Sequence, residues 1–366
     1  MNVRKYKLKK SIVFLFLLFI LPVKLFAAEE KRVIFDENFT WITQKGADRT
    51  LSRIKQAGFN VFVPVVWHGR GVSWNSVLVK EKEPRWENTL SPQTDPLAYL
   101  IEKAHSMGIE VHPWFTVALR QRDFFPSFYD EGTPKKSFNI HQPEFRGFIV
   151  KLMVEVVNKY NIDGVNLDYI RAMGVCDSLY CIKDYKKLSG RSLMDDIRYK
   201  KYNNNALKSI IKWNKLAVTD IVIKFSKKVR LIKPGIIISV DTHPLSPRLL
   251  QEGAASIDWL NQGYIDLIYK MDYYKDPDEK AFNKVLSLLE RPERLVLLVG
   301  NFILPGHYGS PKKYSDKPYA RTGREVLQLI KKSKKMHKYQ SHLALYDYTF
   351  MNDDQLFSLE QSYTIN

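Results

Sequence analysis

The sequence lacks several motifs that would assign it to a large enzyme class at once. It holds no G-x-S-x-G, which argues against a serine nucleophile on a strand-to-helix elbow. It has no glycine-rich phosphate loop after an early strand, which argues against an open nucleotide-binding sheet. Its eight histidines form neither H-x-H nor H-E-x-x-H, so neither a metal nor a cofactor is expected. A site that gathers His68, His112, His243 and aspartates in space stays the minor alternative.

Cysteine is nearly absent, since Cys176 and Cys181 are the two in the chain. Their closeness in a chain with an export signal, described next, indicates a disulfide. So short a loop would stabilise the fold by about 2 kcal/mol through chain entropy. Its expected role is to shape the surrounding segment, and two free buried thiols are the alternative.

Acidic residues are missing from the first 27 residues, which instead combine basic and apolar stretches. Five basic side chains precede the apolar run SIVFLFLLFILPV, and small residues follow in KLFAAEE. This pattern is typical of a secretory signal peptide cleaved after Ala27 or Ala28, and the run is short for a membrane span. We therefore expect an exported protein, periplasmic or secreted, that meets the membrane through residues 1–27 during export. An uncleaved anchor is the alternative.

The net charge is +18, and removal of residues 1–27 with their six basic side chains would leave +12. A positive field on an exported protein favours anionic polymers, such as cell-wall glycans or acidic polysaccharides. Nucleic acid is not expected as a partner, because export separates the protein from it and no recognised nucleic-acid module is present. Lysines scattered on helix faces for solubility would explain the same charge.

No linker or shift in composition divides residues 28–366, so we predict one domain. Eight β-branched, apolar runs alternate with segments of helical periodicity, and they occupy residues 32–35, 60–66, 109–115, 164–168, 236–241, 267–272, 295–300 and 342–348. Repeated strand-then-helix units predict parallel strands, and eight of them favour a closed (β/α)₈ TIM barrel of the α/β class. Long connections after the second, third, fourth and seventh runs would then lie on the active face as long βα loops.

The strongest local signal is IDGVNLDYIR at residues 162–171, in which Asp168 ends the fourth strand. Residues at the carboxyl ends of barrel strands face the active side. Arg171 could reach back and keep the Asp168 carboxylate ionised, because a nearby cation lowers the pKa of an acid. An ionised aspartate can serve as nucleophile or as stabiliser of an oxocarbenium-like transition state. A structural Asp–Arg pair is the alternative.

Glycoside hydrolysis normally needs a second, protonated carboxyl group. Asp241 and Asp272 end later strands and are the candidates for that acid/base, while Asp347 ends the last one. A structural hydrogen-bonding role is the alternative for each of them.

Substrate-positioning groups are expected around these acids, on the same rim of the barrel. Aromatic rings there could stack on sugars, and basic side chains could orient them. For most of the aromatic rings, packing the loops onto the barrel is the alternative. For His112, a satisfied interior position is the competing interpretation. The predicted binding residues are Trp67, His68, Arg70, His112, Trp114, Arg120, Tyr169, Arg171, Tyr273, Asn301 and Asp347.

Four segments resemble motifs of glycosyl hydrolase-like family 10, a family of exported bacterial proteins. VPVVWHGRG at 63–71 is similar to its second-strand pattern, HPWFT at 112–116 to its H-A-W-F-N, DGVNLDYIR at 163–171 to its D-G-I-H-F-D-x-x-R, and IDLIYKMDYY at 265–274 to its I-D-x-V-x-P-Q-x-Y-W. The resemblance implies a TIM barrel and an endo-acting glycosidase on bacterial envelope glycans, peptidoglycan among them. It carries over Asp168 as the matching functional residue.

The sequence therefore predicts a glycoside hydrolase that acts on an envelope polysaccharide, anionic or N-acetylated, through carboxylate acid/base chemistry. A barrel that binds glycans without cleaving them is the alternative from another class. Such a protein would not need two strand-end carboxylates that converge on one pocket.

Overall fold

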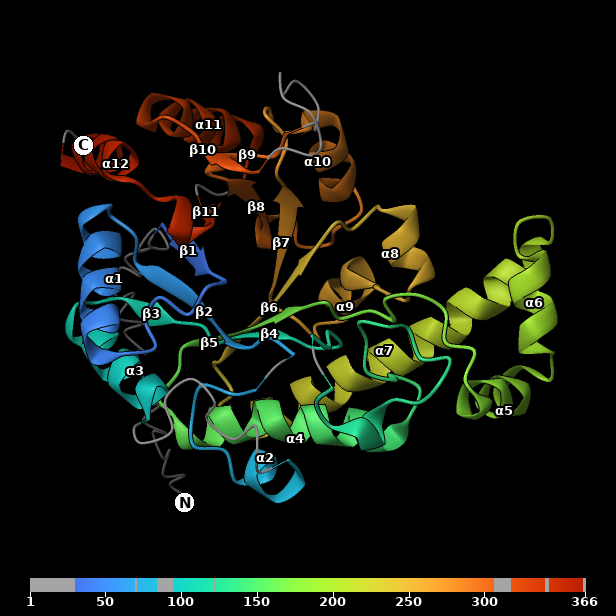
Figure 1. The fold of residues 1–366 in the computed structure, drawn as a ribbon. Helices are drawn as coiled ribbons and strands as arrows, with labels where there is room; N and C mark the ends of the chain where they lie inside the picture. The colour runs from blue at the N-terminus through green and yellow to red at the C-terminus, as the bar shows by residue number, and fades with distance from the viewer. Residues whose placement is uncertain are drawn as a thin grey trace, which may run out of the picture.

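The computed structural model describes residues 30–69, 71–83, 95–121, 123–305, 317–339 and 342–364. Within these ranges the chain folds into a closed barrel of parallel strands surrounded by helices (Figure 1). The proposed signal peptide, residues 1–27, and the predicted binding residue Arg70 lie outside the described residues.

The barrel confirms all eight predicted strand runs. Its order is β1, β2, β4, β5, β6, β7, β8, β11, and the pairing of β11 with β1 closes the ring. The third run is split, so that both β3 and β4 pair with β2. The bounds are β1 Arg32–Asp36, β2 Val61–Trp67, β3 Glu110–Val111, β4 Trp114–Thr116, β5 Gly164–Asp168, β6 Ile237–Thr242, β7 Leu267–Asp272, β8 Leu295–Gly300 and β11 Leu343–Tyr346. A short antiparallel pair, β9 Phe302–Ile303 and β10 Tyr319–Ala320, follows β8.

The strands are apolar along their whole length because both of their faces are covered. Every residue of β2 and of β8 is buried. Inside the barrel, the ring of Phe35 meets Trp114 and Tyr269 edge-on, at centroid distances of 5.7 and 5.3 Å. The interior is therefore a packed core, and a pocket can open only at its rim.

The outer layer is helical, and most of its helices begin at a polar N-cap. Thr43, Asp95 and Ser178 each accept a hydrogen bond from a backbone N–H of the first turn that follows. The helices are α1 Gln44–Gln56, α2 Val77–Lys82, α3 Pro96–Ser106, α4 Pro143–Lys159, α5 Leu179–Ser189, α6 Leu193–Tyr199, α7 Asn204–Ile232, α8 Pro247–Gln251, α9 Ser256–Asn261, α10 Glu279–Leu286, α11 Gly323–Met336 and α12 Asp353–Thr364. Short 3₁₀ turns occupy Pro126–Phe128, Pro292–Arg294 and Tyr348–Phe350.

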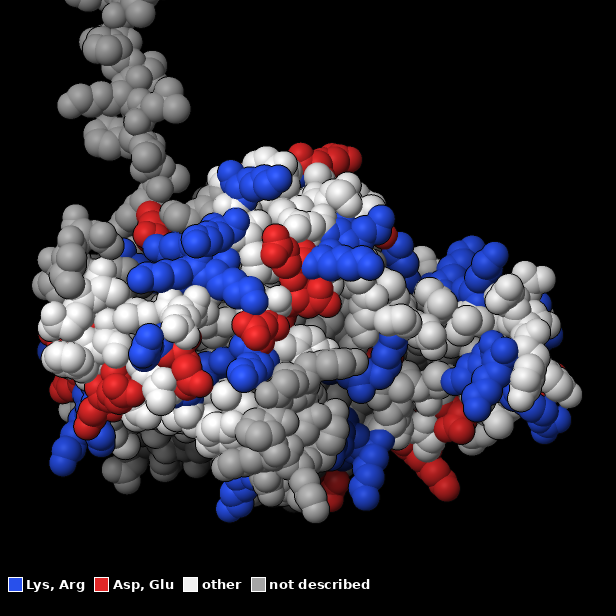
Figure 2. Space-filling model, turned by 90° about the horizontal axis from the view of Figure 1, so that it is seen from above, with Lys and Arg blue, Asp and Glu red and all other residues white. Residues whose placement is uncertain are grey.

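Helices α5 and α6 form an arm that projects from the barrel together with one end of α7 (Figure 1). The arm has a small apolar core of its own, made of Cys176, Cys181, Tyr185, Leu193, Ile210 and Trp213. Lys and Arg side chains spread over the face seen in Figure 2, including the arm at its right, and do not form one patch.

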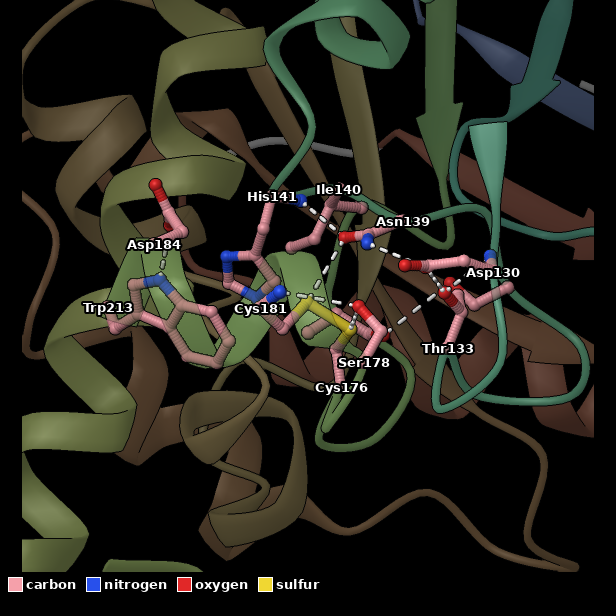
Figure 3. Close-up of a disulfide and its surroundings, with 12 residues drawn as sticks. Asp130, Thr133, Asn139, Ile140, His141, Cys176, Ser178, Cys181, Asp184 and Trp213 are labelled. Carbon is pink, nitrogen blue, oxygen red and sulfur yellow. Dashed lines mark hydrogen bonds between the residues drawn. A yellow bond between two sulfur atoms is a disulfide. The ribbon is translucent and has the colours of Figure 1, made fainter. Parts of the chain in front are cut away.

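Cys176 and Cys181 are joined in the disulfide suggested by their spacing, with an S–S distance of 2.12 Å. The bridge links the loop after β5 to the start of α5 (Figure 3). Beside it, the ring of His141 stacks on Trp213 with centroids 3.4 Å apart. The disulfide thus fixes the base of the arm, eight residues after Asp168.

Candidate active site

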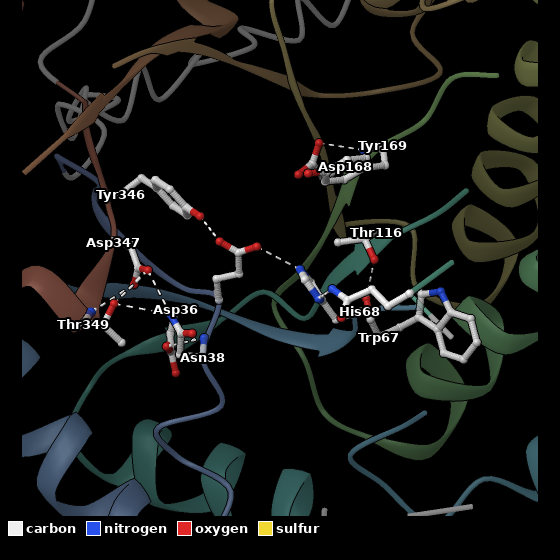
Figure 4. A network of polar contacts seen from close by, with 12 residues as sticks. Asp36, Asn38, Trp67, His68, Thr116, Asp168, Tyr169, Tyr346, Asp347 and Thr349 are labelled. Carbon is white, nitrogen blue, oxygen red and sulfur yellow. Dashed lines mark hydrogen bonds and ion pairs between the residues drawn. The ribbon is translucent and has the colours of Figure 1, made fainter. Parts of the chain in front are cut away.

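A pocket of about 90 Å³ opens at the carboxyl ends of the barrel strands. Carboxyl groups and aromatic rings from most of the strands line it, and Figure 4 shows Asp168, Tyr169 and Tyr346 among them. Its lining consists of Phe35, Glu37, Trp114, Asp168, Tyr169, Asp241, Met271, Tyr273, Leu298 and Tyr346.

Asp168 ends β5 and points inward, on the same face as Asn166, because side chains alternate along a strand. It is 6% exposed, and its Oδ1 accepts a hydrogen bond of 2.6 Å from the backbone N–H of Tyr169. Burial raises the pKa of Asp168 to about 6, against the lowering effect of Arg171 and of that hydrogen bond. Arg171 does not pair with Asp168, since its Nε lies 3.1 Å from Glu252. The expectation that Arg171 would keep the pKa of Asp168 low is therefore wrong, because desolvation outweighs its charge.

Asp241, the second predicted acid, lines the same pocket from the neighbouring strand β6. Its Oδ1 accepts a hydrogen bond of 2.9 Å from Nδ2 of Asn166. Burial raises the pKa of Asp241 well above its usual range, and the negative charge of Asp168 raises it further. The register pairs Leu167 with Val240, so Asp168 and Asp241 are level with each other on adjacent strands.

Glu37 is a third carboxylate in the pocket, and sequence reasoning missed it. One of its oxygens accepts a hydrogen bond from the hydroxyl of Tyr346, and the other lies 2.9 Å from Nε2 of His68. Asp36 points the other way and accepts hydrogen bonds from Thr40. The available signal was the alternation beyond the first apolar run, which turns every second residue inward, Phe35 and Glu37 among them.

Several predicted binding residues do surround these acids. Trp114, Tyr169 and Tyr273 line the pocket, and His68 reaches Glu37. The rings of Tyr273 and Tyr346 stack with centroids 5.1 Å apart. These rings form an aromatic wall beside the carboxyl groups.

Trp67 and Arg120 lie outside the pocket and pack the loop after β4. An irregularity in register between Val65 and Trp67 accompanies the outward position of the Trp67 ring, which packs on Phe125 and Phe138 at centroid distances of 5.8 and 6.1 Å. Arg120 donates to the carbonyls of residues 135 and 137, and its guanidinium sits 3.7 Å over the ring of Tyr129. Both side chains therefore contribute to loop structure.

His112 lies near the opposite end of the barrel. A Cβ on Gly164, the first residue of β5, would come within 2.6 Å of its ring. Nε2 of His112 is 3.5 Å from Glu110, which itself pairs with Lys31 just before β1. His112 is therefore an interior side chain, as the competing interpretation expected, and it does not line the pocket.

Asp272 turns away from the pocket, because it sits one residue out of phase with the inward-facing Met271 and Tyr273. It is buried, and its Oδ2 accepts from the Lys270 ammonium and from the Asp278 backbone N–H, both at 2.9 Å. Its position gives no support to the expected acid/base role.

Asn301 and Asp347 support the end of the last strand. Oδ1 of Asn301 accepts a hydrogen bond of 2.8 Å from the backbone N–H of Asp347. The Asp347 carboxylate accepts from the Thr349 backbone N–H at 3.0 Å, and from Nδ2 of Asn38 at 3.2 Å. Burial raises the pKa of Asp347 to about 7. These two residues hold the turn that follows Tyr346.

Within the described part of the chain, no helix is long and apolar enough to cross a membrane. No group of three or more His, Cys, Asp or Glu side chains in those ranges is arranged to hold a metal ion.

The pattern of the glycosyl hydrolase-like 10 family matches residues 34–131 and 120–283, which together make up more than half of the chain. The chain belongs to the glycosyl hydrolase-like 10 family. Both matched ranges contain pocket residues, Glu37 and Trp114 in the first, Asp168 and Asp241 in the second.

Two proteins similar in sequence to this chain carry the name glycosyl hydrolase. Glycosyl hydrolase YngK of Bacillus subtilis is 28% identical over 40% of this chain and 29% of its own length. Glycosyl hydrolase DigH of Escherichia coli K12 is 24% identical over 71% of this chain and 65% of its own length. The chain thus spans less than two thirds of either relative.

A solved structure with the same architecture is the glycoside hydrolase domain of PgaB (BpsB) from Bordetella bronchiseptica. It aligns with a TM-score of 0.62 and 12% identity, over 91% of this chain and 98% of that domain. This likeness confirms the (β/α)₈ barrel fold.

Proposed function

We propose that this glycosyl hydrolase-like 10 protein hydrolyses glycosidic bonds in an envelope polysaccharide, the glycan strands of peptidoglycan among them. The observation that carries the proposal is the meeting of Asp168 and Asp241 in one pocket with aromatic walls. Burial raises the pKa of both acids, and perturbed pKa values of this kind are common at active sites. The names of the family and of its relatives point to the same chemistry.

In the proposed mechanism Asp241 is the proton donor and Asp168 the carboxylate. Burial and the charge of Asp168 raise the pKa of Asp241, which favours its protonated form, and a protonated Asp241 can protonate the leaving glycosidic oxygen. Asp168, with a pKa of about 6, is largely ionised at neutral pH and can stabilise or attack the anomeric carbon. Asp241 then acts as base toward the incoming water.

The register of the strands favours retention of anomeric configuration. Neighbouring strands lie about 4.8 Å apart, and Asp168 and Asp241 are level on β5 and β6. Two side chains that are level on adjacent strands are separated by about this strand spacing. Carboxyl groups about 5 Å apart are typical of retaining glycosidases, which form a covalent intermediate. Proton NMR of the first product released should therefore show the anomeric configuration of the substrate. Initial release of the opposite anomer would contradict the assignment of Asp168 as nucleophile.

Glu37 completes the proposed site as a third carboxylate. The Tyr346 hydroxyl and the His68 ring hold it at the pocket wall, where its charge also raises the pKa of Asp168. We assign it to binding sugar hydroxyl groups beside Asp168.

We also propose that the protein is exported, with residues 1–27 removed as a signal peptide. N-terminal sequencing of the protein recovered from its native host tests this. A mature chain that begins at residue 28 or 29 is expected, and recovery of an intact Met1 in the cell envelope would instead indicate an uncleaved anchor.

The proposed activity is tested by incubating the mature protein with purified peptidoglycan and with acidic and N-acetylated glycans, followed by mass analysis of the products. The Asp168→Asn variant should release no new reducing ends and should still bind glycan. Asp353→Asn is the matched control, because Asp353 is 91% exposed on α12. Binding without cleavage by the unmodified protein would favour the glycan-binding alternative, and substantial activity in Asp168→Asn would refute the role of Asp168.

A further inference from the structure

A second cavity, about 400 Å³ in volume, adjoins the carboxylate pocket. Met271 separates the two, since it lines both of them. The lining comes from the segments that follow β6 and β7 and from α10: His243, Pro244, Leu245, Ser246, Lys270, Met271, Tyr274, Asp278, Ala281 and Val285. We call this cavity the Lys270 pocket.

Lys270 is the feature of this cavity that calls for an explanation, because its side chain is a cation that is only 7% exposed. Its ammonium donates to Oδ2 of Asp272 at 2.9 Å, and the described residues supply no second acceptor for it. Oδ1 of Asp272 is buried as well and has no hydrogen-bond donor among those residues. A buried ion pair is costly unless its remaining hydrogen-bonding capacity is filled, so this pair is incomplete as it stands.

We propose that the Lys270 pocket binds the acylamino substituent of a sugar unit next to the bond that is cleaved. The carbonyl oxygen of the substituent accepts a hydrogen bond from the Lys270 ammonium. Its methyl group packs against the apolar part of the wall, which includes Ala281 and Val285. This inference rests on the proposed glycosidase function, and it selects N-acetylated glycans over anionic ones.

The charges around the cavity argue against an anionic substituent. Asp272 neutralises Lys270, and Asp278 adds a negative charge at the cavity wall. An incoming carboxylate would therefore find no net positive charge, whereas a neutral carbonyl needs only a donor. The basic residues seen in Figure 2 are spread over the surface and give no second reason to expect an anion here.

The first test fills the pocket and measures binding with the Asp168→Asn variant as background, so that turnover does not interfere. Calorimetry compares two neutral β-1,4-linked hexamers, one of N-acetylglucosamine and one of glucose. The N-acetylated hexamer should bind at least tenfold more tightly, and Ala281→Trp should abolish that preference. Lys284→Trp is the matched control, because it places the same bulk at an exposed position of α10, and it should keep the preference.

Equal affinity for the two hexamers, no binding of the N-acetylated one, or tighter binding of a galacturonic acid hexamer would overturn the proposal. An unchanged preference in Ala281→Trp would do the same.

Asp272 also accepts a hydrogen bond from the backbone N–H of Asp278, so the ion pair could stabilise the loop between them without contacting the substrate. The second test separates recognition of the acylamino substituent from this structural role. The double variant Lys270→Met with Asp272→Leu removes the ion pair without leaving an unpaired buried charge. If the ion pair recognises the acylamino substituent, the folded double variant should lose the tenfold preference for the N-acetylated hexamer. If the ion pair only stabilises the loop between Asp272 and Asp278, the melting temperature should change and the preference for the N-acetylated hexamer should remain.

The two proposals can fail separately. An unmodified protein that binds N-acetylated hexamer but cleaves no glycan would refute the glycosidase proposal and leave the Lys270 pocket in place. Cleavage that does not depend on the acylamino group would refute the binding role proposed for the Lys270 pocket and leave the glycosidase proposal in place.

Discussion

Replacing Asp168 by asparagine should make the protein more stable at neutral pH while it abolishes turnover. Burial raises the pKa of Asp168 from 3.8 to about 6. At 1.36 kcal/mol for each pKa unit, the ionised carboxylate costs the folded state about 3 kcal/mol relative to the unfolded chain. Asparagine is almost the same size and can still accept the hydrogen bond from the Tyr169 backbone. It also removes a negative charge that raises the pKa of Asp241.

The sign of this effect depends on pH. A raised pKa gives stability that is fully present below about pH 4 and is lost as the pH rises through about 6. Urea unfolding of Asp168→Asn and of the unmodified protein should therefore give similar free energies at pH 4 or below, and a gain approaching 3 kcal/mol for the variant at pH 8. Asp353→Asn, at an exposed site, should show no such trend. A variant less stable than the parent at pH 8 would refute the view that Asp168 is kept ionisable at a cost in stability.

Three further outcomes follow from the site and the fold. The acidic limb of kcat/KM should lie near pH 6, the pKa of Asp168, and a limb near pH 4 in a pH–rate profile would contradict that assignment. Glu37→Gln should lower kcat by about 10²-fold or more, which is the scale of a lost electrostatic contact in an active site. The melting temperature should change little, and unchanged steady-state kinetics would exclude Glu37 from the site. Serine at both Cys176 and Cys181 should cost about 2 kcal/mol in denaturant unfolding and leave kcat within a factor of two, whereas a large loss of activity would mean that the arm shapes the pocket.

The fold was predictable because its signal is spread along the whole chain. Each strand of the barrel is a short apolar run, and each is followed by a helical pattern or a long loop, so an error at any one element would not change the architecture. The split of the third run into β3 and β4 falls at His112 and Pro113. Pro113 has no backbone N–H to donate to the ladder, so the sequence held a signal for this break that was not used.

The site was predicted less completely because strand-end position alone does not say which way a side chain points. Asp168 and Asp241 fall on inward phases of their strands, whereas Asp272 falls on the outward phase and pairs with Lys270. Trp67 would face inward by simple alternation from Val65, but the irregular register between them turns it outward. A strand irregularity depends on the partner strand, so a single sequence does not reveal it.

Glu37 could have been found from the sequence by continuing the alternation past the apolar run. In a barrel, the last inward residues of each strand are no longer covered by the packed interior, and polar groups there gain access to a ligand. Glu37 lies one residue beyond β1 on the inward phase, and Tyr273 lies one residue beyond β7 in the same way. The functional rim of this barrel therefore starts where the apolar run stops, and the hydrophobic pattern that predicts the strands ends just before the residues that carry the chemistry.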